Sequence, residues 1–375
     1  MNNFVNKWLR TLGVLSVLGG GAALMAAARA DCTDLPPLPA VPADARRVTD
    51  FGAVADDDRP DDAALARALA ALRPGDWLVF PPGRYVLARS LLVTTPDVTL
   101  WGPGATLHGT DPADHTLGLR ADGVRVFGLT LTAVTDRRRS EPAQARISLY
   151  GGHAGNVVRG VRIDGAGSGG MLVHGAVDFT IADNIVTHTR ADGIHVTGAS
   201  RHGRVVGNRV TATGDDMIAI VSYDDAAPVR DVLVAGNVVD GTRWGRGLSV
   251  VGGAQVTLRG NTVSDIARAA GILIAQEGNW HTHGVDDVRI EDNRLRGIQR
   301  PAARAGLAAP PTGHAAIEIH TFLAMPWAEG IGAVMLRGNA VEDSGVDPLR
   351  QRAGRRVDDT PGARLDCARL DARLR

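Results

Sequence analysis

Three aspartates and one arginine stand at matching places in a repeated strand pattern: Asp192, Asp215, Asp216 and Arg246. Asp215 and Asp216 are adjacent in "TGDDMIAIVSY", and Asp192 lies 24 residues before Asp216. Carboxylates that lie close together have their pKa values pushed apart, because two neighbouring negative charges repel each other. A pair split in this way can supply the acid and the base that a hydrolytic reaction needs. The alternative is an acidic turn in solvent that Arg246 merely neutralises.

The matching places come from short strands in which apolar and polar residues alternate. These strands align on their aliphatic pairs, which are Met171/Val173, Ile194/Val196, Ile218/Ile220, Leu248/Val250, Ile272/Ile274 and Ile317/Ile319. Asp192, Asp216 and Arg246 each stand two residues before the first aliphatic of their strand. In a parallel stack, successive strands lie about 4.8 Å apart. We therefore expect these three side chains to be neighbours, with Asp215 directly behind Asp216.

The strands belong to a repeat that predicts an all-β chain folded as a right-handed parallel β-helix. Turn asparagines recur every 24 to 46 residues, at Asn184, Asn208, Asn237, Asn261, Asn293 and Asn339, and the sequences between them contain no helical pattern. Stacked asparagines of this kind can hydrogen-bond from one turn to the next. The two-residue hairpin turns of an antiparallel sandwich are missing.

The repeat also predicts how the chain is divided. Residues 46–342 are expected to form the β-helix, and residues 46–90 its N-terminal cap with a helix over 62–72 that covers the exposed edge of the first turn. A Pro/Ala-rich linker over 31–45 precedes it, and an Arg-rich tail over 343–375 follows. "ARLDCARLDARL" in this tail is expected either to form a short helix or to be disordered.

Residues 1–30 are typical of a bacterial secretory signal peptide, with Lys7 and Arg10 before an apolar stretch and "ARA" at 28–30 as a cleavage site. We therefore expect a secreted or periplasmic protein without an integral membrane segment after cleavage. Cys32 and Cys367 are the two cysteines, and an oxidising compartment would allow them to pair if the tail folds back. The 41 basic and 41 acidic residues provide no basic excess, which argues against a nucleic-acid partner.

Polar and aromatic residues near the aspartates suit a groove for a polysaccharide substrate. Eight are candidates for substrate binding: His195, Tyr223, Trp244, Glu277, Trp280, His281, Glu318 and His320. An exposed tryptophan ring can stack on the face of a pyranose, although each ring could equally pack into the local core. "HTH" at 281–283 is weak evidence for a metal, so we expect no metal or other cofactor.

Several stretches resemble known proteins. "DFGAVADDD" with "DDAALARAL" at 50–69 looks like the capping segment of the pectate-lyase-like β-helix superfamily. "ADGI" at 191–194, "GDDMIAI" at 214–220 and "GRGLSV" at 245–250 are similar to successive motifs of the polygalacturonases, the family 28 glycoside hydrolases. The resemblance implies an inverting hydrolase in which Asp215 is the general acid and Asp192 with Asp216 activates water. Inversion requires acid and base carboxyls separated by about 6.5–9.5 Å to seat that water.

The sequence departs from the family at three places. Arg190-Ala191 replaces Asn-Thr, Arg246 replaces a histidine, and Leu273-Ile274-Ala275 replaces the Arg-Ile-Lys that grips a galacturonate carboxylate. We therefore expect a polysaccharide other than polygalacturonate. Two other functions stay open: a Ca²⁺-dependent polysaccharide lyase with Arg246 as base and Asp192, Asp215 and Asp216 on the metal, and a non-catalytic carbohydrate-binding protein.

Overall fold

The computed structural model describes residues 32–111, 116–135, 145–242, 244–301, 307, 309–323 and 330–375. The predicted signal peptide, residues 1–30, lies outside the described residues. From Asp31 onward the chain forms one compact unit.

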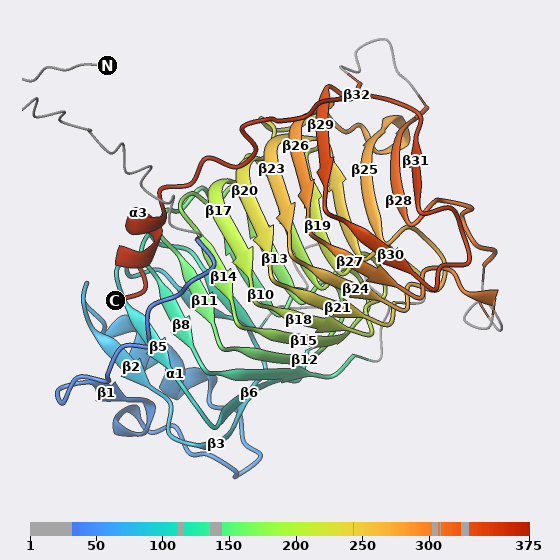
Figure 1. Cartoon of the computed structure of the whole chain (residues 1–375). Helices are drawn as coiled ribbons and strands as arrows, with labels where there is room; N and C mark the ends of the chain where they lie inside the picture. Colours follow the sequence, from blue (N-terminus) through green and yellow to red (C-terminus); the bar gives the residue numbers. More distant parts are fainter. Residues whose placement is uncertain are drawn as a thin grey trace, which may run out of the picture. The chain divides into compact units, whose positions relative to one another are not determined.

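Three parallel sheets form the walls of this unit, and each turn of the chain adds one strand to each sheet (Figure 1). The first sheet contains β1 (Arg46–Arg47), β2 (Trp77–Val79), β5 (Thr99–Trp101), β8 (Arg125–Phe127), β11 (Val157–Arg159), β14 (Thr180–Ala182), β17 (Arg201–Val206), β20 (Arg230–Ala235), β23 (Gly253–Arg259), β26 (Val285–Glu291), β29 (Ala333–Arg337) and β32 (Arg355–Arg356). The second contains β3 (Gly83–Leu87), β6 (Ala105–Gly109), β9 (Thr130–Ala133), β12 (Arg162–Ala166), β15 (Ile185–Thr189), β18 (Arg209–Thr211), β21 (Val238–Asp240), β24 (Thr262–Ser264), β27 (Arg294–Arg296) and β30 (Ala340–Glu342). The third contains β4 (Leu91–Val93), β7 (Leu117–Leu119), β10 (Ile147–Tyr150), β13 (Met171–His174), β16 (Ile194–Thr197), β19 (Ile218–Val221), β22 (Leu248–Val251), β25 (Ile272–Glu277), β28 (Ile317–Phe322) and β31 (Leu349–Gln351). The predicted parallel β-helix is confirmed.

A ladder of buried asparagines keeps the turns in register. Asn237 donates from its side-chain amide to the Asn261 side chain at 2.9 Å and to the Val205 carbonyl at 2.9 Å. It accepts from the backbone N–H of Asn208 at 2.9 Å. The same pattern links Asn184 to Asn208 and continues to Asn339, as the repeat predicted. The backbone groups of these buried turns cannot hydrogen-bond to water, and each asparagine amide provides them with a partner instead.

The N-terminal cap covers the free edge of the second sheet. Helix α1 spans Asp62–Ala70, within the predicted range, and buries Leu65 and Ala68 in the main core. The Asp61 carboxylate accepts from the backbone N–H of Val86 at 3.0 Å, and the Asp62 carboxylate accepts from that of Ala88 at 3.0 Å. Val86 lies in the edge strand β3 and Ala88 directly follows it, so the two aspartates satisfy N–H groups that would otherwise attract another strand.

Strand pairing continues beyond residue 342, where the sequence pattern ends. β31 pairs with β28 and β32 pairs with β29, so the β-helix reaches Arg356 rather than stopping at the predicted boundary. These last strands are short and rich in arginine, and their side chains are exposed or partly exposed. They therefore lack the alternation of apolar and polar residues that marks the earlier turns.

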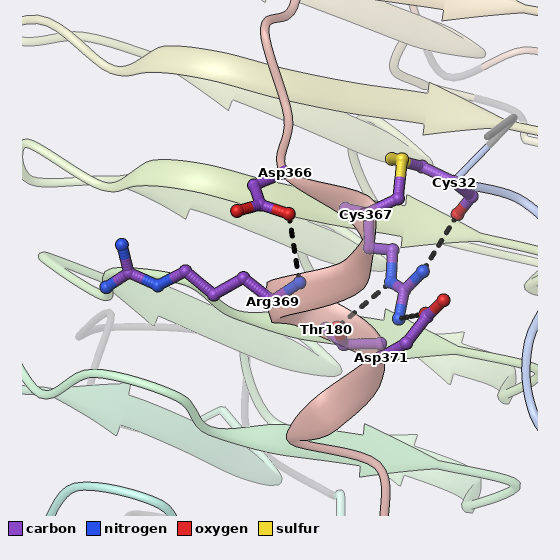
Figure 2. The surroundings of a disulfide bond; sticks show 7 residues. Cys32, Thr180, Asp366, Cys367, Arg369 and Asp371 are labelled. Carbon is purple, nitrogen blue, oxygen red and sulfur yellow. Dashed lines mark hydrogen bonds and ion pairs between the residues drawn. A yellow bond between two sulfur atoms is a disulfide. The ribbon is translucent and has the colours of Figure 1, made fainter. Parts of the chain in front are cut away.

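The C-terminal tail then crosses the outer face of the first sheet and ends in helix α3 (Cys367–Ala372) (Figure 2). Cys367 forms a disulfide with Cys32, as the sequence allowed. The buried Arg204 of β17 donates to the Cys32 carbonyl at 3.0 Å and to the Asp371 carboxylate at 2.7 Å. Both ends of the described chain are therefore fastened to the same wall. Within the described residues, no helix has the length and apolar character needed to cross a bilayer.

Candidate active site

The third sheet has the register that the alternation predicted. Ile194 pairs with Ile218, and Ile218 pairs with Leu248. Pairing extends back into the bend before these strands, because the N–H of Gly193 donates to the Asp216 carbonyl at 2.9 Å and that of Met217 donates to the Arg246 carbonyl at 2.9 Å. Asp192, Asp216 and Arg246 therefore occupy one column on three successive turns.

Glycine allows these turns to pack closely behind Asp215. A side-chain carbon on Gly245 would lie 2.2 Å from the carbonyl carbon of Asp215, and one on Gly214 would lie 2.5 Å from that of Arg190. Real side chains do not tolerate such distances from a rigid backbone. The glycines in "TGDD" and "WGRG" are thus required by the close stacking that brings the acids together.

Asp216 is buried, and both of its carboxylate oxygens have partners. Oδ1 accepts from the backbone N–H of Arg246 at 2.7 Å, and Oδ2 accepts from the Ser249 hydroxyl at 2.6 Å. The Arg246 guanidinium forms an ion pair with Oδ1 at 3.2 Å. Burial raises the pKa of Asp216, and the nearby charge of Arg246 opposes this rise.

Arg246 connects Asp216 to a second, partly buried acid. Its Nη2 donates to Oε1 of Glu277 at 3.2 Å. Burial opposes the charge on Arg246, but the carboxylates of Asp216, Glu277, Asp215 and Asp192 together raise its pKa. Burial also raises the pKa of Glu277, against the attraction of Arg246. Arg246 is therefore a permanent cation that holds a cluster of carboxylates together.

Asp192 is held from the strand that follows it. Its Oδ2 lies 2.6 Å from Nδ1 of His195, and the His195 ring lies parallel to the ring of Tyr223, with 6.4 Å between their centroids. This contact fixes the direction of the Asp192 carboxylate. Asp192 is therefore linked through His195 to Tyr223 on the outer surface of the third sheet.

A groove of about 870 Å³ runs over the third sheet and contains the acids. Nine of the predicted site residues line it: Asp192, Asp215, Asp216, Arg246, His195, Tyr223, Trp244, Glu277 and Trp280. Trp280 is 63% exposed, and Trp244 is 42% exposed with the Arg268 guanidinium 4.1 Å from its ring centre. Both rings are thus accessible next to the acids, as a sugar platform requires.

Three predicted residues lie outside this lining. Glu318 is buried, accepts from the backbone N–H of Ala315 at 2.8 Å and pairs with Arg350 at 3.6 Å, so its charge is used within the wall. His320 packs edge-on against Phe322, with 4.2 Å between ring centroids. His281 lies in a turn, 3.6 Å from the Asp224 carboxylate. Alternation placed Glu318 and His320 on the outer side but did not reveal what covers or flanks them there.

The groove also contains residues that were not among the predicted site residues. They lie on its N-terminal side and include Arg120, Ser148, Tyr150 and His174. Tyr150 pairs directly with His174 in adjacent strands, so extending the alignment one strand before Met171 would have found it. Among the described residues, no group of three or more histidines, cysteines or acids has an arrangement that could hold a metal ion.

Comparison with known proteins supports the same fold. Residues 122–295 match a family model described as a right handed beta helix region. No curated protein sequence matches the chain. A structurally similar protein is the catalytic domain of a GH87 α-1,3-glucanase in complex with tetrasaccharides, with a TM-score of 0.62 and 12% identity over 88% of this chain and 71% of that chain.

Two further solved structures are similar. The catalytic unit of the GH87 α-1,3-glucanase from Streptomyces thermodiastaticus strain HF3-3 has a TM-score of 0.58 and 20% identity, covering 86% of this chain and 71% of that chain. The family 28 exopolygalacturonase of Yersinia enterocolitica has a TM-score of 0.52 and 16% identity, covering 84% of this chain and 76% of that chain. The fold is therefore a right-handed parallel β-helix of the kind found in these glycoside hydrolases.

Three of the similar glucanase structures each carry one aspartate-to-alanine substitution and contain bound nigerose or tetrasaccharides. Two of the substituted positions are adjacent, and the third lies 23 residues before the pair.

Proposed function

We propose that this chain is an inverting glycoside hydrolase that cleaves a polysaccharide of the α-1,3-glucan class. The observation that carries the proposal is the gathering of Asp192, Asp215 and Asp216 on adjacent turns, inside one groove with exposed tryptophans. Two carboxyl groups with different surroundings are the chemical requirement for inverting hydrolysis.

The surroundings of the three acids suggest their roles. Asp192 and Asp216 stand on successive turns, about 4.8 Å apart along the stack. His195 orients the first, while Ser249 and Arg246 orient the second. We assign to this pair the binding and deprotonation of the attacking water. Asp215, on the partly exposed side of the groove, is assigned as the acid that protonates the leaving oxygen.

The spacing of the acids matches that of the substituted glucanase aspartates. Asp215 and Asp216 are adjacent, and Asp192 lies 23 residues before Asp215. The glucanase structures have one adjacent pair and a third position at the same separation. On a shared β-helix scaffold, equal spacing corresponds to equal places on two successive turns, which supports equivalent sites.

An uncharged sugar at the cleaved bond fits the charges of the groove. Within the part of the chain that the structure describes, five carboxylates line it, namely Asp192, Asp215, Asp216, Asp225 and Glu277. Leu273, Ile274 and Ala275, which replace the basic polygalacturonase motif, are all buried. A uronate at the cleavage point would therefore meet like charge without a cation from this strand, which costs binding energy.

The lyase alternative needs Arg246 to accept a proton. The charged state of Arg246 is stabilised instead, because its ion pairs with Asp216 and Glu277 raise the pKa of the guanidinium. A neutral arginine base is unfavourable in this cluster. We therefore propose hydrolysis rather than a lyase reaction. We also propose that the protein is exported to the periplasm or medium, because the Cys32–Cys367 disulfide suits an oxidising compartment.

The test is to incubate the mature protein with α-1,3-glucan and with a panel of other polysaccharides, and to measure new reducing ends. The anomer formed first is then identified by proton NMR. We expect α-1,3-glucan to yield saturated products with inverted configuration, unaffected by a chelator. Asp215→Asn should lower kcat by at least about 100-fold, the usual contribution of a general acid.

Asp183→Asn is the matched control. Asp183 lies in a turn beside the first sheet, where it pairs with Arg159 in a partly exposed ion pair, and it should keep full activity. Full activity of Asp215→Asn would exclude Asp215 as the acid. Unsaturated products that absorb ultraviolet light and disappear with a chelator would establish the lyase instead.

A further inference from the structure

The N-terminal arm of the groove differs from the catalytic part in charge. The described groove residues of the turns of β7, β10 and β13 include Arg120, Ser148, Tyr150 and His174, and none of these described residues is a carboxylate. The five carboxylates among the described lining residues belong to the turn that contains β16 and to the turns after it. This arm, defined by Arg120, Tyr150 and His174, has no role in the cleavage proposed above.

Arg120 is fixed in place with part of its donor capacity unused. Its Nη1 donates to the carbonyls of Ser148 at 2.8 Å and Leu119 at 3.1 Å, and its Nη2 donates to the Ser148 hydroxyl at 2.8 Å. A guanidinium has five N–H groups, so one on Nε and one on Nη2 have no hydrogen-bond partner among the described residues. These two N–H bonds lie side by side and match the two oxygens of a carboxylate.

Tyr150 and His174, on the next two turns, stack beside Arg120 in one row. The Tyr150 ring lies 5.5 Å from the Arg120 guanidinium on one face and stacks on His174 on the other, with 4.3 Å between ring centroids. Both faces of Tyr150 are therefore covered, although the residue remains 47% exposed. What the arm offers to a ligand is the polar rim of three stacked groups about 4.8 Å apart, rather than a flat platform.

We propose that this arm binds an acidic sugar unit of the substrate through the free edge of Arg120. The inference rests on the proposed hydrolase function and specifies its substrate: a polysaccharide with uncharged units at the cleaved bond and a carboxylate-bearing unit further along the chain. Arg120 and Asp192 are three turns apart, so the acidic unit lies about 14 Å along the axis from the cleavage point.

The experiment compares two polymers, α-1,3-glucan partly oxidised to carboxylate at C6 and its unoxidised parent. Binding is measured by affinity electrophoresis with the Asp215→Asn protein, so that the polymer stays intact. We expect about 10-fold tighter binding of the carboxylated polymer, the value typical of one charge-assisted hydrogen-bonded pair. Adding Arg120→Gln should bring the ratio of the two affinities to about one, and Arg120→Lys should keep part of it, because lysine retains the charge but loses the paired N–H groups.

Ile185→Ala is the control, because Ile185 is an exposed apolar residue of the second sheet and should leave the ratio unchanged. Thermal melting checks that each variant is folded. If Arg120→Gln does not fold, Arg120→Lys alone tests whether Arg120 causes the difference in affinity between the two polymers. Equal affinity for the two polymers, binding of neither, or a ratio that Arg120 substitutions leave unchanged would each overturn the proposal. Failure of the proposed hydrolase function would give a different result: the affinity ratio would be preserved, but the wild-type protein would release no product from either polymer.

Discussion

Replacing Arg246 with methionine should destabilise the protein through the charge that it leaves behind. Asp216 would remain buried, next to Asp192 and without the guanidinium that pairs with it at 3.2 Å. Removing one partner of a buried ion pair costs about 3–5 kcal/mol. The Ser249 hydroxyl and the backbone N–H at position 246 still bind the carboxylate, so we expect the lower end of this range, about 3 kcal/mol. Urea denaturation at pH 7 measures the loss, with the exposed Arg209→Met as a control expected within about 0.5 kcal/mol.

The pH dependence of this loss tests its cause. Without Arg246, burial and Asp192 raise the pKa of Asp216 further in the folded state, whereas the unfolded carboxyl keeps a pKa of about 3.9. A raised carboxyl pKa costs stability at neutral pH, and the cost disappears as both states become protonated. The gap between wild type and Arg246→Met should therefore narrow from pH 7 to about pH 4, and it should also be smaller in an Asp216→Asn background. A gap that stays constant over this pH range would refute the reasoning.

Two further predictions concern other parts of the fold. The Cys32→Ser/Cys367→Ser double variant should lose about 2–5 kcal/mol, because the disulfide closes a sequence separation of 335 residues, and its melting temperature should no longer respond to a reductant. For His314, burial lowers the pKa to about 4, so the unfolded state binds a proton between pH 6.5 and 4 that the folded state does not. The wild type should therefore lose stability on acidification through this window more steeply than His314→Gln, and parallel melting curves against pH would contradict this.

The sequence was sufficient to predict the register of the candidate site. In a parallel stack without helices between the strands, an aliphatic pair on each turn must point inward, so a single alignment determines every neighbouring residue. The buried asparagine ladder, for example Asn208 with Asn237, adds a second constraint on the same register. For this reason Asp192, Asp216 and Arg246 could be placed on successive turns before any coordinates were known.

The burial of individual side chains and the path of the C-terminal tail were harder to predict, for physical reasons. Glu318 and His320 point away from the core as alternation requires, yet Arg350 from the following strand pairs with Glu318. The path of the tail depends on single contacts far apart in sequence, such as Arg204 with Asp371 and Arg369 with Asp178. A periodic pattern carries no information about such isolated partners.

Arginine at position 246 is explained by the charges around it. The family 28 motif that "GRGLSV" resembles has histidine there, and a histidine is charged or neutral depending on pH. In this chain the position faces the buried Asp216 and the partly buried Glu277, and burial raises the pKa values of both carboxyls. In the proposed hydrolase, a residue that is always charged would favour the anionic form of Asp216 while protons move at Asp192 and Asp215. We therefore interpret Arg246 as a fixed counter-ion of the carboxylates that the proposal makes catalytic, neither the base of a lyase nor a titrating substitute for histidine.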